Sequence, residues 1–381
     1  MSIAEEPRTA ESVLGRSLDD VEYITDLARA NMDADSLAHE VTNNADTMFT
    51  WDYTKGARPR LERLYEKAKT SQWNGSTDLD WSIDVDPEGI LPVMSDIPPT
   101  AEDLGIDDPR SPIYKWDDKQ LRAFNTEQVR WRLSNFLHGE QGALLCTAKI
   151  VETVPWIDAK YYAATQVVDE ARHVEVFGRY LEEKLGGQYP INVHLGLLLD
   201  DIIEDSRWDM TYLGMQIMVE GLALAAFGFM RMGTEEPLLK ELLRYVMSDE
   251  ARHVAFGVLS LEEYYQHLTT PELLERQEFC FEAAIRMRDR FLAQEVWEAF
   301  GVDTKEMCKR ILSVPPERME FQRMLFSKIV PNCKKLGLLD AGDGWLRDRF
   351  TDIGVIQFED WQDTSEEYLD LDAVDGEASS S

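Results

Sequence analysis

The chain has 381 residues, of which 39 are Lys or Arg and 72 are Asp or Glu, so its formal net charge at pH 7 is −33. Hydrophobic residues make up 44% and charged residues 29%, which is a globular profile and excludes a chain that is disordered throughout. The acidic excess argues against nucleic acid or an anionic membrane as the main partner, because both are bound through a basic face.

Residues 1–115 read as an N-terminal helical and irregular extension. Short helical patterns over 17–31 and 57–70 precede the stretch SQWNGSTDLDWSIDVDPEGILPVMSDIPPTAEDLG, where Pro and Gly recur too often for a long helix. From about 118, apolar residues recur at helical spacing between short turns. The helices expected there span 118–153, 156–185, 193–231, 236–267, 271–300 and 316–336.

We expect residues 116–340 to form one helical domain and 341–381 a C-terminal segment. From 359 onward the chain carries nine acidic residues and no Lys or Arg. That composition is typical of a solvated, disordered tail, which could also recruit a partner.

One stretch, Tyr212–Met232, is long and apolar enough to span a membrane, but Glu220 lies at its middle. A lone carboxylate is costly in lipid, so we expect a helix buried inside the protein, with a partner for Glu220, and no membrane span.

The four cysteines lie far apart, and no C-x-x-C pair occurs, which is typical of a reducing compartment. The N-terminal sequence MSIAEEPRTAESVLG carries acids where a signal peptide needs a basic start and an apolar core. We therefore expect a cytoplasmic protein.

An internal repeat is the most informative feature of the sequence. The string DEARHV occurs at 169–174 and again at 249–254, and the same offset of 80 residues aligns Glu140 with Glu220. Each half thus contains a Glu, a second Glu thirty residues later, and a His three residues after that. The two sets are Glu140, Glu170, His173 and Glu220, Glu250, His253.

The spacing predicts that these six side chains meet. Residues at i and i+3 share one face of a helix, so each Glu-x-x-His pair presents two ligands together. The midpoint of each thirty-residue gap is a turn, at Pro155 and at Glu235. If the chain reverses there, the two Glu of each half lie at the same height on antiparallel neighbours, roughly 22 Å from the turn. Four helices then bring four Glu and two His into one layer, which is the ligand set of di-iron and di-manganese carboxylate proteins.

Two divalent cations would neutralise four carboxylates that could not otherwise be buried together. Carboxylate and imidazole ligands suit iron or manganese better than structural zinc. Two other readings stay open: a solvated charged helix face, and a metal-free bundle in which the same residues form a buried polar network.

The residues that flank the ligands also repeat. Asp169 and Asp249 precede the ligating Glu residues and could reach across to the opposing imidazoles, as carboxylates beside metal-bound His commonly do. Arg172 and Arg252 could neutralise these aspartates.

With these motifs, residues 118–267 resemble the ferritin-like di-iron carboxylate superfamily, in particular its oxygenases and the small subunits of ribonucleotide reductase. The D-E-x-R-H form of both motifs is most similar to the hydroxylase components of bacterial multicomponent monooxygenases. The resemblance implies a ferritin-like four-helix bundle with extra N- and C-terminal helices. It also implies a di-iron centre that reduces O2 and oxidises an organic substrate.

Several positions depart from the subfamilies. Phe177 stands where the reductase subunits carry the radical Tyr, and Leu224 stands where the monooxygenases carry a Thr that assists O2 activation. Val246 replaces the third His of the arylamine N-oxygenases. Ala143 and Met215 replace the Val–Tyr crosslink of the ligand-binding oxidases. No subfamily is matched in full.

Helical geometry also suggests which side chains surround the metal site. The pocket candidates are Phe136, Thr147, Gln166, Phe177, Gln216, Leu224 and Phe227. Together they describe a narrow apolar chamber with few polar groups, which favours an apolar or aromatic substrate over a highly charged one.

The function expected is that of an O2-dependent di-iron oxygenase or oxidase acting on a small apolar, aromatic or acyl substrate. Two iron ions are expected, with Mn/Fe as the alternative pair, together with an external electron donor, because the sequence has no flavin, nicotinamide or Fe–S motif. We also expect an electron-transfer protein as partner and a homodimer. The alternatives are a radical-generating subunit like that of ribonucleotide reductase and a non-catalytic iron-binding protein.

Overall fold

The computed structural model describes residues 17–29, 38–91 and 99–368, and within these ranges the regular secondary structure is entirely helical. This confirms the expected all-α fold.

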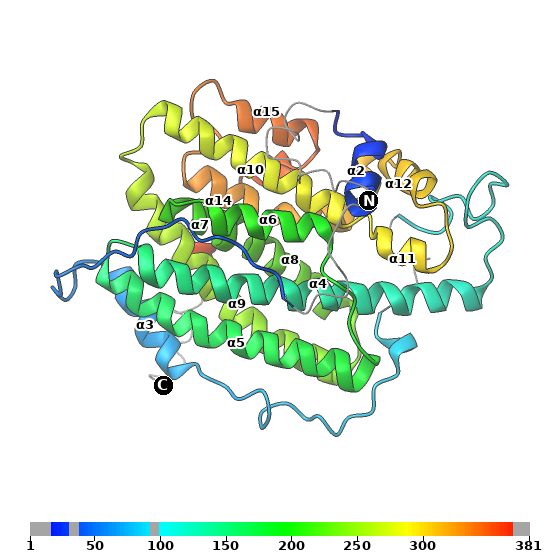
Figure 1. Cartoon of the computed structure of the whole chain (residues 1–381), viewed down its shortest axis with the longest axis horizontal. Coiled ribbons are helices and arrows are strands. Elements are labelled where there is room, and N and C mark those ends of the chain that lie inside the picture. The colour runs from blue at the N-terminus through cyan, green and yellow to red at the C-terminus, as the bar shows by residue number, and fades with distance from the viewer. Residues whose placement is uncertain (1–16, 30–37, 92–98, 369–381) are drawn as a thin grey trace.

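Four helices form the centre of the molecule (Figure 1). One antiparallel pair consists of α4 (Asp118–Thr153) and α5 (Ile157–Leu185). The other pair consists of the composite helix Trp208–Gly233 and α9 (Pro237–Tyr265). A long connection through α6 (Val193–Glu204) joins the two pairs. Two antiparallel pairs with one long crossover make a ferritin-like four-helix bundle.

The ends of these helices follow from local sequence. α4 begins at a capping box, in which the Asp117 carboxylate accepts a hydrogen bond from the Gln120 amide at 2.9 Å. It ends two residues before Pro155, and α5 starts two residues after it. The Glu236 carboxylate caps α9 by accepting from the Leu238 amide at 2.9 Å. Both turns therefore lie where the repeat predicts them.

The composite helix contains an irregular turn directly before Glu220. It consists of α7 (Trp208–Tyr212), the π-helical segment η2 (Leu213–Val219) and α8 (Glu220–Gly233). A π-turn inserts a residue into the helical period and therefore rotates the side chains that precede it relative to those that follow.

The sequence pattern predicts one helix over 193–231, but the structure breaks it between α6 and α7. Lys149, a buried residue of α4, donates hydrogen bonds to the carbonyls of Ile202, Ile203 and Asp205 at 3.2, 2.8 and 2.5 Å. These carbonyls belong to the end of α6, so a cation from another helix stabilises the terminus. An interaction between helices thus decides a boundary that hydropathy alone does not mark.

The remaining helices surround the bundle. α3 packs against α5 and α9, while α10 packs against α6 and η2 on another side of the bundle. The predicted helix over 271–300 stops at Arg290, and the predicted helix over 316–336 divides into short segments. The outer elements are α2 (Val21–Arg29), α3 (Pro59–Thr70), η1 (Pro87–Gly89), α10 (Thr270–Arg290), α11 (Gln294–Ala299), α12 (Thr304–Leu312), η3 (Pro316–Arg318), α13 (Glu320–Met324), η4 (Leu325–Ser327), α14 (Ile329–Lys335), α15 (Trp345–Asp352) and η5 (Ile356–Phe358).

The segment 359–368 differs from the solvated tail that its composition predicts. Asn332, fully buried in α14, accepts a hydrogen bond from the Thr364 amide at 3.0 Å and donates to the Thr364 hydroxyl at 3.1 Å. Lys335 pairs with Glu366 at 2.8 Å. Acidic side chains of residues 359–368 form ion pairs with lysines of α14, so these residues pack against the helical domain. Residues 369–381 lie outside the described residues, and the domain boundaries at 115 and 340 stay predictions.

The stretch Trp208–Gly233 is long and apolar enough to cross a membrane by length and composition. It is also mostly buried within the protein, and Glu220 lies among other polar side chains there. Length and composition alone do not distinguish a core helix from a membrane span.

Candidate metal centre

The six residues of the repeat lie together in the middle of the bundle. Glu140 comes from α4, Glu170 and His173 from α5, Glu220 from the start of α8, and Glu250 with His253 from α9. All six are buried, with at most 5% of any residue exposed. Each of the four central helices therefore contributes to one polar layer inside an apolar core.

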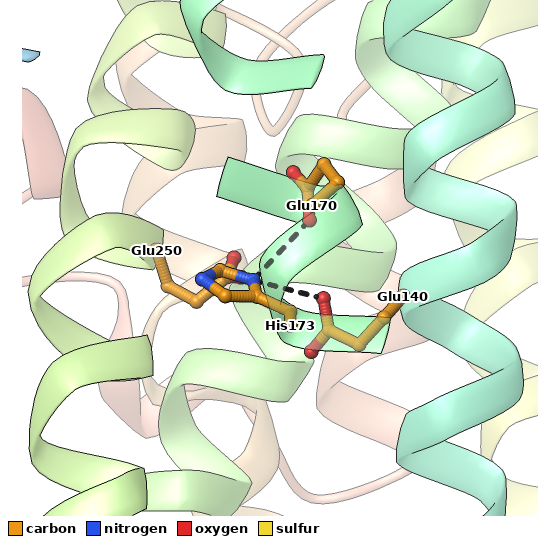
Figure 2. A group of neighbouring side chains, drawn as sticks. All are labelled: Glu140, Glu170, His173 and Glu250. Atoms are coloured by element: carbon orange, nitrogen blue, oxygen red, sulfur yellow. Dashed lines mark hydrogen bonds and ion pairs between the residues drawn. The ribbon is translucent and has the colours of Figure 1, made fainter. Parts of the chain in front are cut away.

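His173 is the centre of the first group of side chains. Its Nδ1 lies 3.2 Å from Oε2 of Glu140, 3.4 Å from Oε2 of Glu170 and 3.1 Å from Oε1 of Glu250. Figure 2 shows these side chains converging from three helices. The ligand atoms of the four residues lie within 4.8 Å of one another, which is close enough to hold one metal ion.

His253 is the centre of the second group. Its Nδ1 lies 3.1 Å from Oε1 of Glu170 and 3.5 Å from Oε2 of Glu250. Glu170, Glu220 and His253 also offer ligand atoms within 4.8 Å of one another. Glu170 and Glu250 therefore lie between the two imidazoles, where a carboxylate could bridge two ions.

Several polar atoms of this layer have no hydrogen-bond partner. They include Oε2 of Glu170, Oε2 of Glu220, both carboxylate oxygens of Glu250, and Nδ1 of His253. All of these except Oε2 of Glu220 lie within 3.5 Å of the opposite group in the imidazole–carboxylate pairs above, but without the geometry of a hydrogen bond. Buried polar atoms are almost always paired, and unpaired carboxylate oxygens in a core are especially costly. Two divalent cations would satisfy these atoms and neutralise four carboxylates. The buried Glu/His cluster therefore fits a di-metal site.

The protonation of the layer shows how strongly these groups interact. Burial, together with the charge of Glu250, raises the pKa of Glu140 to about 8. Burial and the carboxylates of Glu170 and Glu250 raise the pKa of Glu220 well above its usual value. Burial acts to lower the pKa of His173, but the neighbouring carboxylates outweigh it and raise that pKa well above its usual value. Protons thus supply part of the positive charge that bound cations would replace.

The flanking aspartates reach across the bundle. Oδ2 of Asp249 lies 3.2 Å from Nε2 of His173, and Oδ2 of Asp169 lies 3.4 Å from Nε2 of His253. Each imidazole therefore faces the ligand layer with one nitrogen and an aspartate of the opposite half with the other. These contacts have the geometry expected from the repeat, and their role toward a bound metal stays a prediction.

The two arginines of the repeat join these aspartates into one network. Arg172 donates to Asp169 at 2.5 Å and to Asp249 at 3.1 Å. Arg252 donates to Asp249 and lies 3.5 Å from Asp169. Two guanidinium groups thus balance two buried carboxylates beside the ligand layer.

Two residues of the N-terminal extension also contact this network, and the sequence patterns miss them. Trp73 Nε1 donates a hydrogen bond of 2.7 Å to Oδ2 of Asp249. Gln72 Nε2 donates to Oδ1 of Asp169 at 3.1 Å. The only sequence signal is the unusual number of Trp and Asp residues that follow Ser71, and this composition does not by itself indicate a functional site.

A small apolar cavity adjoins the layer, and Glu140, Glu220 and Glu250 form part of its wall. Of the seven pocket candidates, Phe136 and Phe227 line it. Their rings meet edge to face with centroids 4.7 Å apart. Phe177 lies behind them, stacked on Phe227 at 5.7 Å.

The other pocket candidates lie elsewhere. Gln166 donates to Oε1 of Glu170 at 2.9 Å and of Glu220 at 3.0 Å, so it contacts the ligand layer rather than the cavity. Thr147, Gln216 and Leu224 are buried but are not part of the cavity wall. Gln216 lies in the π-helical segment, where the helical spacing differs from that of an α-helix. The prediction that Gln216 lines the cavity assumed regular spacing between this residue and Glu220.

The structure adds one charged residue to the cavity wall that the repeat does not indicate. Arg290, the last residue of α10, lines the cavity together with Glu140, Glu220 and Glu250. α10 follows the repeat in the chain, so its register relative to the metal layer depends on helix packing.

No family model and no curated protein matches the chain. Among solved structures, the chain is similar to an R2-like ligand-binding oxidase with an aerobically reconstituted metal cofactor after photoconversion. The identity is 16% over 75% of this chain and 95% of that chain, with a TM-score of 0.46. A point mutant of an R2-like ligand-binding oxidase with an anaerobically reconstituted Mn/Fe cofactor shows 18% identity over 68% and 92%, with a TM-score of 0.42. Similarity at this level is too distant to assign an activity.

Proposed function

We propose that this chain is an O2-dependent oxidoreductase with two bound iron ions, an oxygenase or an oxidase, acting on a small organic substrate with an apolar, aromatic or acyl body. The observation that carries this proposal is the buried layer of four Glu and two His, with unpaired oxygens, at the wall of an apolar cavity. Mn/Fe is the alternative metal pair.

In this proposal Glu140, Glu170 and His173 would hold one ion, and Glu220, Glu250 and His253 would hold the other. Glu170 and Glu250 lie between the imidazoles and are the candidates for bridging. When bound, the metal pair would supply the reduction of O2 and the oxidation of the substrate.

The protein's own side chains have three tasks. Asp169 and Asp249 accept from the outer imidazole nitrogens and so hold each ring in one orientation. Gln166 fixes the carboxylates of Glu170 and Glu220 relative to each other. The aromatic wall formed by Phe136 and Phe227 keeps water away from the reacting groups.

Electrons from an external donor need a path to the buried layer, and Trp73 supports one. Its indole hydrogen-bonds Asp249, and the same Asp249 oxygen lies 3.2 Å from His173. The indole is also stacked on Tyr245, with centroids 4.8 Å apart, and faces the Arg172 guanidinium at 4.7 Å. We propose that an electron-transfer protein docks on this side of a cytoplasmic homodimer.

The same path favours a second candidate function, a radical-generating subunit for a partner enzyme. Trp73 could carry an oxidising equivalent outward as readily as an electron inward. The two functions differ in what is consumed. An oxygenase or oxidase converts a small substrate at its own site and needs a partner only to supply electrons, whereas the radical-generating subunit requires a partner enzyme that converts the substrate.

The test is metal analysis of the purified protein together with O2 consumption after anaerobic reduction. We expect two ions per chain and O2 uptake that an added small substrate alters. In His253→Ala the metal content falls below two, while Glu175→Gln, an exposed change on α5, leaves it at two. Many irons per chain would indicate an iron-storage protein, and retention of two ions in His253→Ala would overturn the ligand assignment.

A further inference from the structure

Arg290 is a buried cation at the wall of the cavity beside the metal layer. It is the last residue of α10 and is only 5% exposed. The chain turns sharply after it, with Ala293 in the left-handed region at φ 50°, before α11 begins. Non-glycine residues rarely adopt this conformation, so the turn that follows Arg290 is held by its surroundings.

In the part of the chain that the structure describes, the guanidinium of Arg290 has no anionic partner. Among the described residues it forms no ion pair and no side-chain hydrogen bond, and its Nε is buried and unsatisfied. Among these residues, the guanidinium makes one cation–π contact, with the ring of the adjacent Phe291, whose centroid lies 4.8 Å from the guanidinium carbon. Burial lowers the pKa of Arg290 to about 10, so it remains positively charged at neutral pH.

The other buried arginines of α10 show what such a residue ordinarily requires. Arg276 lies 3.0 Å from the carboxylate of Asp209, and Arg286 lies 2.7 Å from that of Glu282. A buried charge without a partner is destabilising, whereas a paired one is tolerated. Arg290 is therefore the position on this helix where a partner from outside the protein would be accommodated.

The carboxylates of the metal layer do not take this role. Glu140, Glu220 and Glu250 line the same cavity as Arg290, yet none of them pairs with it. In the proposed function, two divalent ions balance the four carboxylates of the layer. The single positive charge of Arg290 then remains, and one monoanionic group would neutralise it.

We propose that Arg290 binds the carboxylate of the substrate, so that the substrate is a small organic monoacid whose apolar body lies between Arg290 and the metal layer. This inference rests on the proposed function. The planar guanidinium offers two parallel donors that match a carboxylate. Leu195, Phe227 and Met287 line the cavity and would contact the apolar body. Substrate selection thus combines one charged contact with an apolar wall.

The experiment compares acids with their neutral amides. Binding of phenylacetate and phenylacetamide, and of hexanoate and hexanamide, is measured by calorimetry on the full chain under argon, with and without added iron(II). A charge-assisted hydrogen bond predicts that the wild-type protein binds each acid at least about tenfold more tightly than its amide. No preference for the acids in the wild-type protein would overturn the proposal, whatever the variants do.

Two variants and a control locate the contact. In Arg290→Gln the acids bind at least about tenfold more weakly while the amides change by less than about twofold, and Arg290→Lys recovers part of the loss. Arg288→Gln removes a charge from the same helix at a residue paired with Asp289, and leaves both affinities unchanged. Equal weakening of acids and amides in Arg290→Gln, or unchanged acid binding there, would overturn the proposal.

Failure of this inference is distinguishable from failure of the proposed function. Arg290→Gln should retain two ions per chain, because Arg290 is not among the six proposed metal ligands. Wild-type protein with two ions and no preference for acids overturns the role of Arg290 alone. Wild-type protein that binds no iron overturns the proposed function, and its preference for acids can still be measured without metal.

Discussion

The indole of Trp73 donates a hydrogen bond of 2.7 Å to Asp249, and this links the N-terminal extension to the aspartate whose carboxylate lies 3.2 Å from Nε2 of His173. The extension lies outside the repeat that supplies the six Glu and His residues, yet it completes their surroundings. Asp249 therefore has partners from α5, from α9 and from the extension.

Trp73→Phe should keep two metal ions per chain but slow reduction of the metal centre by a protein donor or a dye. Phe retains an aromatic ring and loses the donor to Asp249, and changes in such outer partners typically cost about 10- to 100-fold in activity or affinity. Stopped-flow spectroscopy measures the rate. Trp81→Phe is the matched control, because the Trp81 indole donates to the Gly75 carbonyl instead. Equal rates in wild type and Trp73→Phe would exclude this path.

Glu220→Gln should have opposite effects on the metal-free and metal-loaded proteins. Burial and neighbouring carboxylates raise the pKa of Glu220, so the metal-free fold favours the protonated form and loses stability above the ordinary carboxyl pKa, where Glu220 ionises in the unfolded chain. Removing the charge should therefore stabilise the metal-free protein at pH 7. The gain should vanish as the pH falls toward the ordinary carboxyl pKa, where Glu220 is protonated in both the folded and the unfolded states.

In the same variant, metal affinity should fall by more than about 100-fold, because loss of an outer partner alone costs 10- to 100-fold. Thermal unfolding with and without iron(II) measures both effects. Glu182→Gln, an exposed change on α5, is the control and should affect neither. Stabilisation of the variant by iron equal to that of wild type would remove Glu220 from the ligand set.

Gly257→Ala should destabilise the protein by about 1–3 kcal/mol through overpacking. A Cβ at Gly257 would lie 2.4 Å from Cβ of Gln216, so α9 and the π-turn approach more closely than a methyl group allows. Gly178→Ala on α5 is the control, since its Cβ would meet only Leu137 at 3.8 Å. Chemical denaturation measures both variants. A neutral result at Gly257 would show that the π-turn shifts freely.

Two truncations measure what residues 359–368, which pack against α14, contribute to stability. Removing 359–381 should lower the free energy of unfolding by about 1–3 kcal/mol, because buried Asn332 loses both hydrogen bonds to Thr364. Removing only 369–381 should change it by less than about 0.5 kcal/mol. Denaturant titration measures both. If the shorter truncation removes activity with a partner but leaves O2 uptake intact, the acids beyond 368 serve the partner.

The amino-acid sequence by itself predicts three of the four central helices, α4, α5 and α9, and the layer of four Glu and two His residues. The i, i+3 spacing of Glu170 and His173 is a local property of a helix, and the turn around Pro155 sets the height at which Glu140 faces them. An 80-residue repeat doubles the same geometry. Helical periodicity and turns depend on the residue types within a short segment, so these features can be predicted without knowing how distant segments pack.

Tertiary structure alone decides which residues complete the site. Trp73 and Arg290 belong to segments without repeat or motif, and they reach the centre only because the extension docks on α5 and α9 and α10 docks on the bundle. Lys149, on α4, stabilises the end of α6 by donating to the Asp205 carbonyl. The π-turn changes the register of Gln216 from the one expected of a regular α-helix. Each outcome depends on contacts between helices far apart in the chain, which helical periodicity does not encode.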